Sequence, residues 1–369
     1  MSQKPLFRAD HVGSLLRPLA IKDARKMHFE DNTASINELV SIEDNEIKKV
    51  INFQESLGFK VVTDGEFRRS FWHYDFIEGL SGFELEERET GVQFSGAKLR
   101  PFFPVIKGKI DFPSDHPMLN HFKFVSANTN VLPKISIPGP SCCHFRTTPD
   151  DIYPKEYSDN ENLFFDIAQA YKKAVKEFYE IGCRYLQMDD IFFAYLCDPD
   201  HRSVRTKFGE NPDDLINKYA WMLNESIKDR PDDMTIGMHL CRGNFKSNFA
   251  AKGAYDPAVD AVFNEIDIDV YFLEYDDERS GGLEPLKYLP KGHKRVLPGF
   301  ITTKKGKLED VEFLQRKFDE ASKFVSMDQL GIAPQCGFSS TEEGNIITFD
   351  DQKRKLELVI ETSNKIWGE

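Results

Sequence analysis

A histidine and a cysteine stand two positions apart, as His239 and Cys241, at the end of a short apolar run. On an extended strand, residues i and i+2 point to the same side, so both side chains can reach one point. Zn2+ accepts imidazole and thiolate together, at metal–ligand distances of roughly 2.0 to 2.3 Å. Alone, the pair is more simply interpreted as packed or hydrogen-bonded side chains. Cys336, followed by Gly337, ends another apolar run and adds a second thiol.

A fourth candidate ligand is Glu274, which ends the run Val270-Tyr271-Phe272-Leu273. A carboxylate there is costly to bury without a partner, so it binds a metal or pairs with Arg242 or Arg279. We predict one catalytic zinc ion held by four residues, His239, Cys241, Glu274 and Cys336. Packing in the core or at the surface is predicted for the other four cysteines, Cys142, Cys143, Cys183 and Cys197.

Such a centre would activate a thiol. A free thiol has a pKa of roughly 8.5, and its thiolate is the nucleophile. Coordination to Zn2+ deprotonates the thiol outright. We expect the sulfur of a substrate to take an exchangeable zinc position and to become a thiolate nucleophile there. Glu274 is the only oxygen ligand in this set, so it is the candidate for the ligand that adjusts.

Eight short apolar runs alternate with helical patterns along the chain, and each run ends in polar or special residues. Buried parallel strands are typically such continuous runs, and eight of them predict an α/β fold of the (β/α)8 barrel type. In such barrels the residues at the C-terminal strand ends form the site. The runs are Ala9–Ser14, Lys60–Asp64, Lys134–Pro138, Arg184–Asp189, Thr235–His239, Asp269–Glu274, Arg295–Gly299 and Gly331–Gln335.

Capping residues indicate where the helices lie. Capping boxes are predicted at Ser41 with Asp44 and at Ser158 with Glu161, and the helices that follow are expected to stop at Gly58 and Gly182. Asp310 is predicted to cap a third helix, and a fourth is expected to run through Leu356, Val359 and Ile360.

The interval between the second and third runs is too long for one helix. Within it, Ala97–Phe112 is predicted to form a β-hairpin that turns at Lys107-Gly108-Lys109. We therefore expect one catalytic domain over residues 1–369, with residues 78–131 as an insertion between strands 2 and 3.

The composition excludes several classes of partner. The formal net charge is −13 and there is no block of five basic residues, so neither nucleic acid nor an anionic membrane is expected to bind. The densest cluster of lysines, at positions 304, 305 and 307, is predicted to be a solvated loop.

Met1–Pro5 lacks the apolar core of a signal peptide, and no run is long enough to span a bilayer. Six cysteines without a regular framework indicate a reducing, cytoplasmic location.

The chain resembles the catalytic domain of cobalamin-independent methionine synthase, and more closely its short stand-alone relatives. The zinc motif of that family is a His-x-Cys, a later Glu and a later Cys. It matches His239, Cys241, Glu274 and Cys336 of this chain. Its amino-acid-binding motifs match Gly13-Ser14, Gly65-Glu66 and Gln187-Met188-Asp189-Asp190, with Asp190 in place of a Glu. The resemblance implies that homocysteine binds at Gly13, Ser14, Glu66 and Asp189, with Glu66 and Asp189 also serving catalysis.

The resemblance fails where the methyl donor would bind. The full-length enzymes have an additional N-terminal barrel that helps bind folate, and 369 residues leave no room for it. The family histidine implicated in protonating the folate is missing from residues 297–304. His11, His73 or Asp190 could replace it. The pairs Phe71-Trp72 and Phe102-Phe103 are predicted to fill the core, with a role in lining a donor pocket as the alternative.

The leading hypothesis is zinc-dependent methyl transfer to homocysteine, which gives methionine. The alternatives are another small thiol, a corrinoid donor, a zinc lyase or hydrolase, and a non-catalytic zinc or amino-acid-binding protein. The expected partners are the small thiol, a methyl donor and a possible partner protein that delivers the methyl group. The methyl donor and the oligomeric state are left open.

Overall fold

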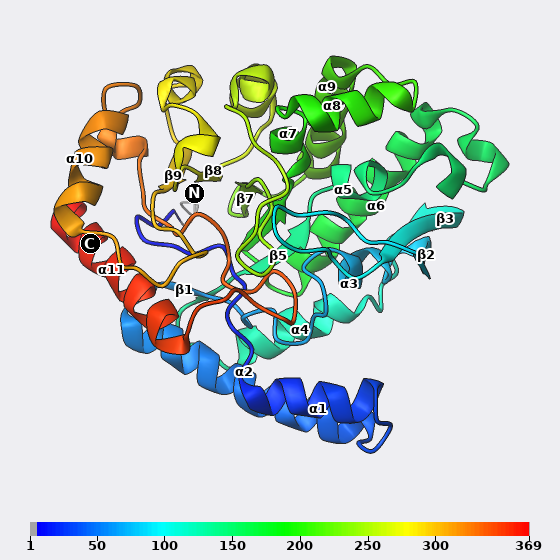
Figure 1. Ribbon diagram of the computed structural model, residues 1–369, viewed down its shortest axis with the longest axis horizontal. Helices are drawn as coiled ribbons and strands as arrows, with labels where there is room; N and C mark the ends of the chain where they lie inside the picture. The colour runs from blue at the N-terminus through cyan, green and yellow to red at the C-terminus, as the bar shows by residue number, and fades with distance from the viewer. Residues whose placement is uncertain (1–5, 369) are drawn as a thin grey trace.

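A computed structural model describes residues 6–368 (Figure 1). The prediction about Met1–Pro5 lies outside these residues. No described helix is both long and apolar enough to cross a membrane.

Five parallel strands form the central sheet, in the order of the chain. They are β5 (Ile135–Pro138), β6 (Tyr185–Asp189), β7 (Thr235–Leu240), β8 (Val270–Glu274) and β9 (Arg295–Gly299). Each strand is parallel to the next, and nearly all their residues are buried. This burial on both faces explains their apolar sequences. The five predictions for these strands are confirmed to within a residue or two at each end.

The other predicted strands complete the barrel of which this sheet is a part. β1 (Val61–Val62) pairs in parallel with β4 (Leu132–Pro133), which leads directly into β5. The first and eighth predicted strands are joined to each other by the isolated parallel bridge from Ala9 to Ile332. The eighth strand and the residue before it are joined to β9 and the segment that follows it by the bridges Leu330 to Val296 and Pro334 to Ile301. Pro334 lacks the N–H that a longer ladder would need. Within residues 6–368, eight extended segments therefore form the predicted α/β barrel.

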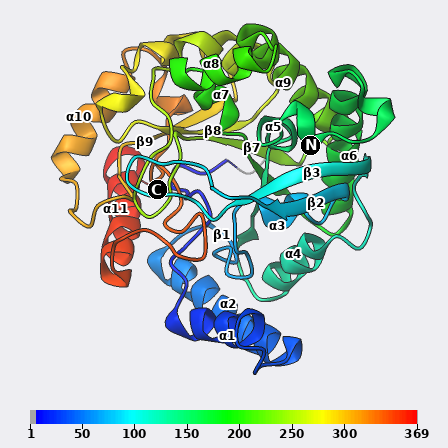
Figure 2. The same ribbon diagram turned by 45° about the vertical axis from the view of Figure 1, so that its right-hand side comes forward.

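Helices cover the outside of the barrel (Figures 1 and 2). The longer ones are α1 (Leu19–Phe29), α2 (Ile36–Leu57), α4 (Pro117–Ala127), α6 (Asn160–Glu180), α8 (Pro199–Lys207), α9 (Pro212–Ile227), α10 (Val311–Ala321) and α11 (Phe349–Trp367). The short ones are α3 (Tyr74–Ile77), α5 (Ser141–Phe145) and α7 (Phe192–Tyr195). Single turns of 3-10 or π-helix occur at Pro149–Asp151, Lys155–Tyr157, Asp256–Ala258, Ala261–Glu265, Glu278–Ser280, Glu284–Tyr288 and Met327–Gln329.

Two predicted helix starts are wrong. The capping box of α2 is formed by Ser35 and Glu38, one turn and a half before the predicted Ser41. The cap of α6 is Asp159, whose carboxylate accepts the Glu161 N–H. Both sites offer several capping side chains in a row, so the pattern alone does not select one. Asp310 caps α10 as predicted, by accepting the Phe313 N–H.

The predicted hairpin turn is also wrong. Lys107-Gly108-Lys109 lies inside β3 (Phe102–Asp111), which pairs antiparallel with β2 (Ser81–Glu87), an earlier segment. Gly82 permits a close approach between the strands, because a Cβ there would lie 2.6 Å from the Gly108 carbonyl oxygen. The register shifts at this point, and Gly82 has φ +86°. Figure 2 shows this two-stranded sheet beside the barrel, near α3 and α4.

The core has two parts. A small cluster inside the barrel includes Val12, Val61, Tyr185, Val270 and Phe272, and a larger one lies between the strands and the helices. The barrel interior also holds a buried ammonium group. Lys134 Nζ donates to Asp10 Oδ1 at 2.8 Å and to Gln187 Oε1 at 3.0 Å.

Candidate metal centre and substrate cavity

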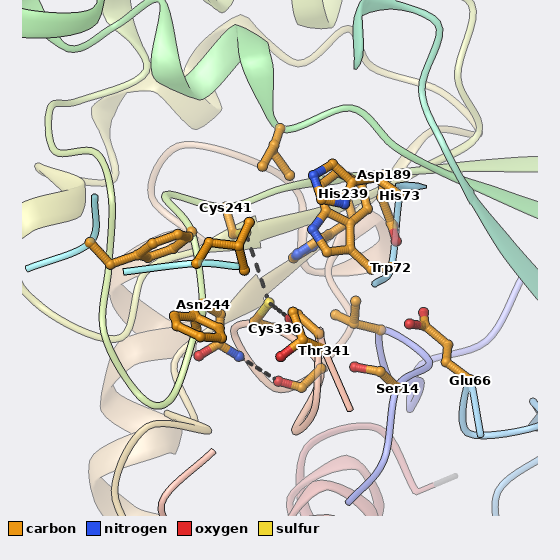
Figure 3. A pocket seen from close by; sticks show the side chains of 18 of the residues that line it. Ser14, Glu66, Trp72, His73, Asp189, His239, Cys241, Asn244, Cys336 and Thr341 are labelled. Carbon is orange, nitrogen blue, oxygen red and sulfur yellow. Dashed lines mark hydrogen bonds between the residues drawn. The ribbon is translucent and has the colours of Figure 1, made fainter. Parts of the chain in front are cut away.

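Three of the four predicted metal ligands lie together at one end of the barrel. His239 is the last residue but one of β7, Cys241 follows that strand, and Cys336 lies beyond the eighth segment. One ligand atom of each lies within 4.8 Å of the others, and all three residues are buried. The two sulfurs are 3.8 Å apart (Figure 3). Two thiolates at about 2.3 Å from one tetrahedral zinc ion would be separated by about 3.8 Å, so this spacing suits zinc.

The state of His239 also fits a metal ligand. Among the described residues, neither ring nitrogen has a nitrogen or oxygen partner, and the neighbouring group is the Cys336 sulfur. Buried imidazoles are normally hydrogen-bonded, whereas this ring is not committed to any nitrogen or oxygen of the described residues. The adjacent Cys241 thiol and the His239 charge hold the pKa of Cys336 well below its usual range, against the effect of burial. The donor set therefore fits a zinc ion.

Glu274 lies outside this group of three. Its Oε1 accepts from Arg279 and from Lys304, both at 3.0 Å, and its Oε2 accepts the Arg242 N–H. Burial by itself would raise the pKa of this carboxyl, but the charges of Lys304, Arg242 and Arg279 lower it to about 2. The ion pair that the sequence left as an alternative is therefore present with Arg279.

Lys304 corrects another expectation. It is only 8% exposed, whereas a solvated loop was predicted for the lysine cluster at positions 304, 305 and 307. Its place shortly after β9, at the same end of the barrel as Glu274, is the signal that could have identified it.

Three of the residues assigned to amino-acid binding line one cavity with the metal ligands. Ser14, Glu66 and Asp189 all line one cavity, part of which is open to solvent (Figure 3). Glu66 Oε1 accepts from Ser136 at 2.9 Å, while its Oε2 has no partner among the described residues. Asp189 accepts from Gln187 at 2.7 Å, and burial raises its pKa to about 7. The cavity thus offers two carboxylates to a bound cation.

The backbone around these residues is tightly packed. Gly13 does not line the cavity, but a Cβ there would lie 3.4 Å from Ser136 Oγ. Glu66 itself has φ +60°, a strained conformation for a residue with a side chain. A Cβ on Gly337 would lie 1.9 Å from Ser14 Oγ. These glycines therefore let neighbouring segments approach closely enough to place Ser14 and Glu66.

A family model described as "Cobalamin-independent synthase, Catalytic domain" matches residues 9–349. This chain belongs to that family. It is 44% identical to the uncharacterized protein YxjH of Bacillus subtilis, over 99% of this chain and 96% of the relative. A solved Listeria monocytogenes structure, provisionally assigned as a vitamin-B12-independent methionine synthase, is 38% identical with TM-score 0.79 and full coverage of both chains. A B12-independent methionine synthase of Shewanella sp. W3-18-1, in complex with selenomethionine, shares the fold at 20% identity, TM-score 0.75 and 98% coverage of each chain.

Of the three candidates for a replacement acid in this cobalamin-independent synthase domain, one lines the cavity. His73 does so, and burial and then the Arg146 charge lower its pKa well below the usual value, so the ring is neutral. His11 packs edge-on against Phe59 away from the cavity. Asp190 accepts from Ser141, also away from the cavity, and burial raises its pKa to about 7.

The sequence missed several cavity residues of this synthase domain. Asn244 donates from Nδ2 to the Gly337 carbonyl at 2.8 Å, and Arg146 and Tyr195 come from helical segments that carry no motif. Trp72 lines the cavity, which was the alternative to its predicted core role. The four remaining cysteines are buried outside the metal group.

Proposed function

We propose that this protein is a zinc-dependent methyltransferase that moves a methyl group to the thiol of homocysteine, giving methionine. The carrying observation is that the His239, Cys241 and Cys336 group and the carboxylates of Glu66 and Asp189 line one cavity. A thiol-activating centre thus stands beside groups that bind an ammonium ion. The selenomethionine bound to the Shewanella neighbour supports an amino-acid ligand of this size.

Within this proposal, His239, Cys241 and Cys336 hold the ion, which would supply a thiolate at neutral pH. Glu66, through its free Oε2, and Asp189 bind the amino group of homocysteine. Ser14, which the close-packed Gly13 helps to place, forms part of the wall around it. With a pKa of about 7, Asp189 can also hold the proton that the thiol releases.

Glu274 is proposed as the adjustable fourth ligand. Its charge acts on both His239 and Cys241, and it ends β8, which pairs with the strand that carries His239. Arg279 and Lys304 compete for the same carboxylate. Three protein ligands leave one position for a substrate, as in other catalytic zinc sites.

We further propose one catalytic domain over residues 1–369, with the β2–β3 region inside an insertion at residues 78–131, and a cytoplasmic location. All six cysteines are free thiols, in agreement with a reducing compartment. The methyl donor is proposed only as an activated methyl compound, whether folate, a corrinoid or a methyl group delivered by a partner protein.

The test is methionine formation by the zinc-loaded protein from homocysteine and methyltetrahydrofolate. Cys336→Ser should lose both the metal and the activity, while the matched Cys183→Ser, buried outside the metal group, should keep both. Zinc content and homocysteine binding are measured separately. A zinc-loaded protein that fails to bind homocysteine would refute the proposal. Homocysteine binding without methionine formation would exclude methyltetrahydrofolate as the methyl donor, and corrinoid or protein-borne donors would be tested next.

A further inference from the structure

Arg146 is a buried cation that faces the cavity from the end of α5. Its side chain lines the cavity, the residue is 9% exposed, and its Nε has no partner among the described residues. The guanidinium lies 5.1 Å from the ring centre of Phe192 and 5.9 Å from that of Tyr195. The groups that act on its charge are Tyr74, Tyr195, whose side chain also pairs with the guanidinium, and Cys142. All three are neutral at ordinary pH because burial raises their pKa.

No carboxylate among residues 6–368 forms an ion pair with Arg146. Other buried arginines of the chain do have such partners, for example Arg205 with Glu210 at 2.5 Å. Aromatic faces offset less than the desolvation of a full charge, and buried charges are normally paired. A guanidinium that is buried, unpaired and open to a cavity is therefore a site for an anion.

His73 supplies a second, neutral group beside this cation. Its ring is stacked between Trp72, at 4.4 Å between centroids, and Tyr74, at 3.8 Å, so its plane is held in place. Both ring nitrogens are buried and have no partner among the described residues (Figure 3 shows the ring with Trp72). As a neutral imidazole it can donate one hydrogen bond to an anion and accept another from a ligand.

The two groups lie on different elements from the proposed amino-acid site. Ser14, Glu66 and Asp189 stand at strand ends, as does the metal group, whereas Arg146 follows α5 and His73 precedes α3. The amino acid would occupy the strand ends, with its sulfur at the metal. A second substrate that reacts with this sulfur must then occupy the part of the cavity lined by Trp72, His73 and Arg146.

We propose that Arg146 and His73 form an anion-binding subsite that receives the carboxylate of the methyl donor. This inference rests on the proposed function and narrows the donor to a carboxylate-bearing compound. The carboxylate of the acceptor amino acid is the other source of the same chemistry, and binding measurements separate the two.

The experiment measures equilibrium binding to the zinc-loaded protein by calorimetry, without turnover. Two donors are compared with carboxylate-free counterparts: 5-methyltetrahydrofolate with 5,6-dimethyltetrahydropterin, and glycine betaine with choline. At least one carboxylate compound should bind about tenfold or more tightly than its counterpart, as expected for charge-assisted hydrogen bonds. Arg146→Gln should abolish this preference and Arg146→Lys should keep part of it. The control Arg184→Gln removes another ring-stacked arginine, before β6 at the opposite barrel end, and should change nothing.

The acceptor is tested with L-methionine and its carboxylate-free analogue 3-(methylthio)propylamine. Under the proposal, Arg146→Gln leaves the affinity for both unchanged. Weaker binding of methionine alone would assign the anion site to the amino acid and overturn the donor assignment. The proposal also fails if the wild-type protein prefers neither carboxylate donor, a result that needs no variant, or if the preference survives in a folded Arg146→Gln. Failure of the zinc-loaded protein to bind homocysteine, with an intact carboxylate preference, would refute the proposed function but not the subsite.

Discussion

Replacement of Lys304 by Met tests the ion pairs behind the metal group. Lys304 Nζ lies 3.0 Å from Glu274 Oε1, and the side chains are 7% and 0% exposed. The substitution keeps an unbranched side chain but removes the charge. Glu274 then keeps Arg279, also at 3.0 Å, and the Arg242 N–H. The carboxylate thus loses one of its two ion-pair partners and stays buried.

The size of the effect follows from these contacts. Breaking a buried ion pair lowers the free energy of unfolding by about 3 to 5 kcal/mol, and the remaining Arg279 places Lys304→Met near the lower end. At about 2.1 cal/mol/K per residue, a chain of 369 residues has an unfolding entropy of about 0.8 kcal/mol/K. A loss of about 3 kcal/mol therefore lowers Tm by about 4 °C.

The assay is thermal and urea unfolding of the metal-free protein, so that metal binding does not contribute. Lys305→Met, at an exposed neighbouring position, is the matched control and should change stability by less than about 0.5 kcal/mol. Lys304→Met with Glu274→Gln should be more stable than the sum of the single variants implies, with a coupling of about 1 to 3 kcal/mol. Equal Tm values for Lys304→Met and Lys305→Met, or strict additivity, would refute the reasoning.

Two further predictions concern packing and pH. Gly337→Ala should displace Ser14, because its Cβ would lie 1.9 Å from Ser14 Oγ. The loss of one or two hydrogen bonds to the ligand would then weaken methionine binding about tenfold or more. Unchanged affinity in calorimetry would contradict this prediction. Burial raises the pKa of Asp190 to about 7, so its contribution to stability is present below the unfolded pKa of about 3.9 and is lost as pH rises through 7. Between pH 4 and 8 the Tm of the wild-type protein should therefore fall relative to that of Asp190→Asn, and parallel curves would exclude this role.

Much of the fold was predictable because local physics dictates it. Strands buried on both faces must be apolar throughout, so the runs at 184–189, 235–239 and 269–274 identify β6, β7 and β8. The two-residue period of a strand likewise places His239 and Cys241 on one side, and Asp310 caps its helix through its own backbone neighbours. In these cases the deciding interaction lies within a few residues along the chain.

Only the tertiary structure decided the features that depend on distant segments. Lys107-Gly108-Lys109 resembles a turn, but it lies inside a strand whose partner is at 81–87, and Gly82 of that partner permits the close approach. Lys304 and Glu274, 30 residues apart, form a buried ion pair because neighbouring strands end at the same side of the barrel. Arg146 faces the cavity with no carboxylate among the described residues to pair it. Packing decides which charged side chains are buried and which of them become neighbours. The linear sequence does not show which charges will lie side by side.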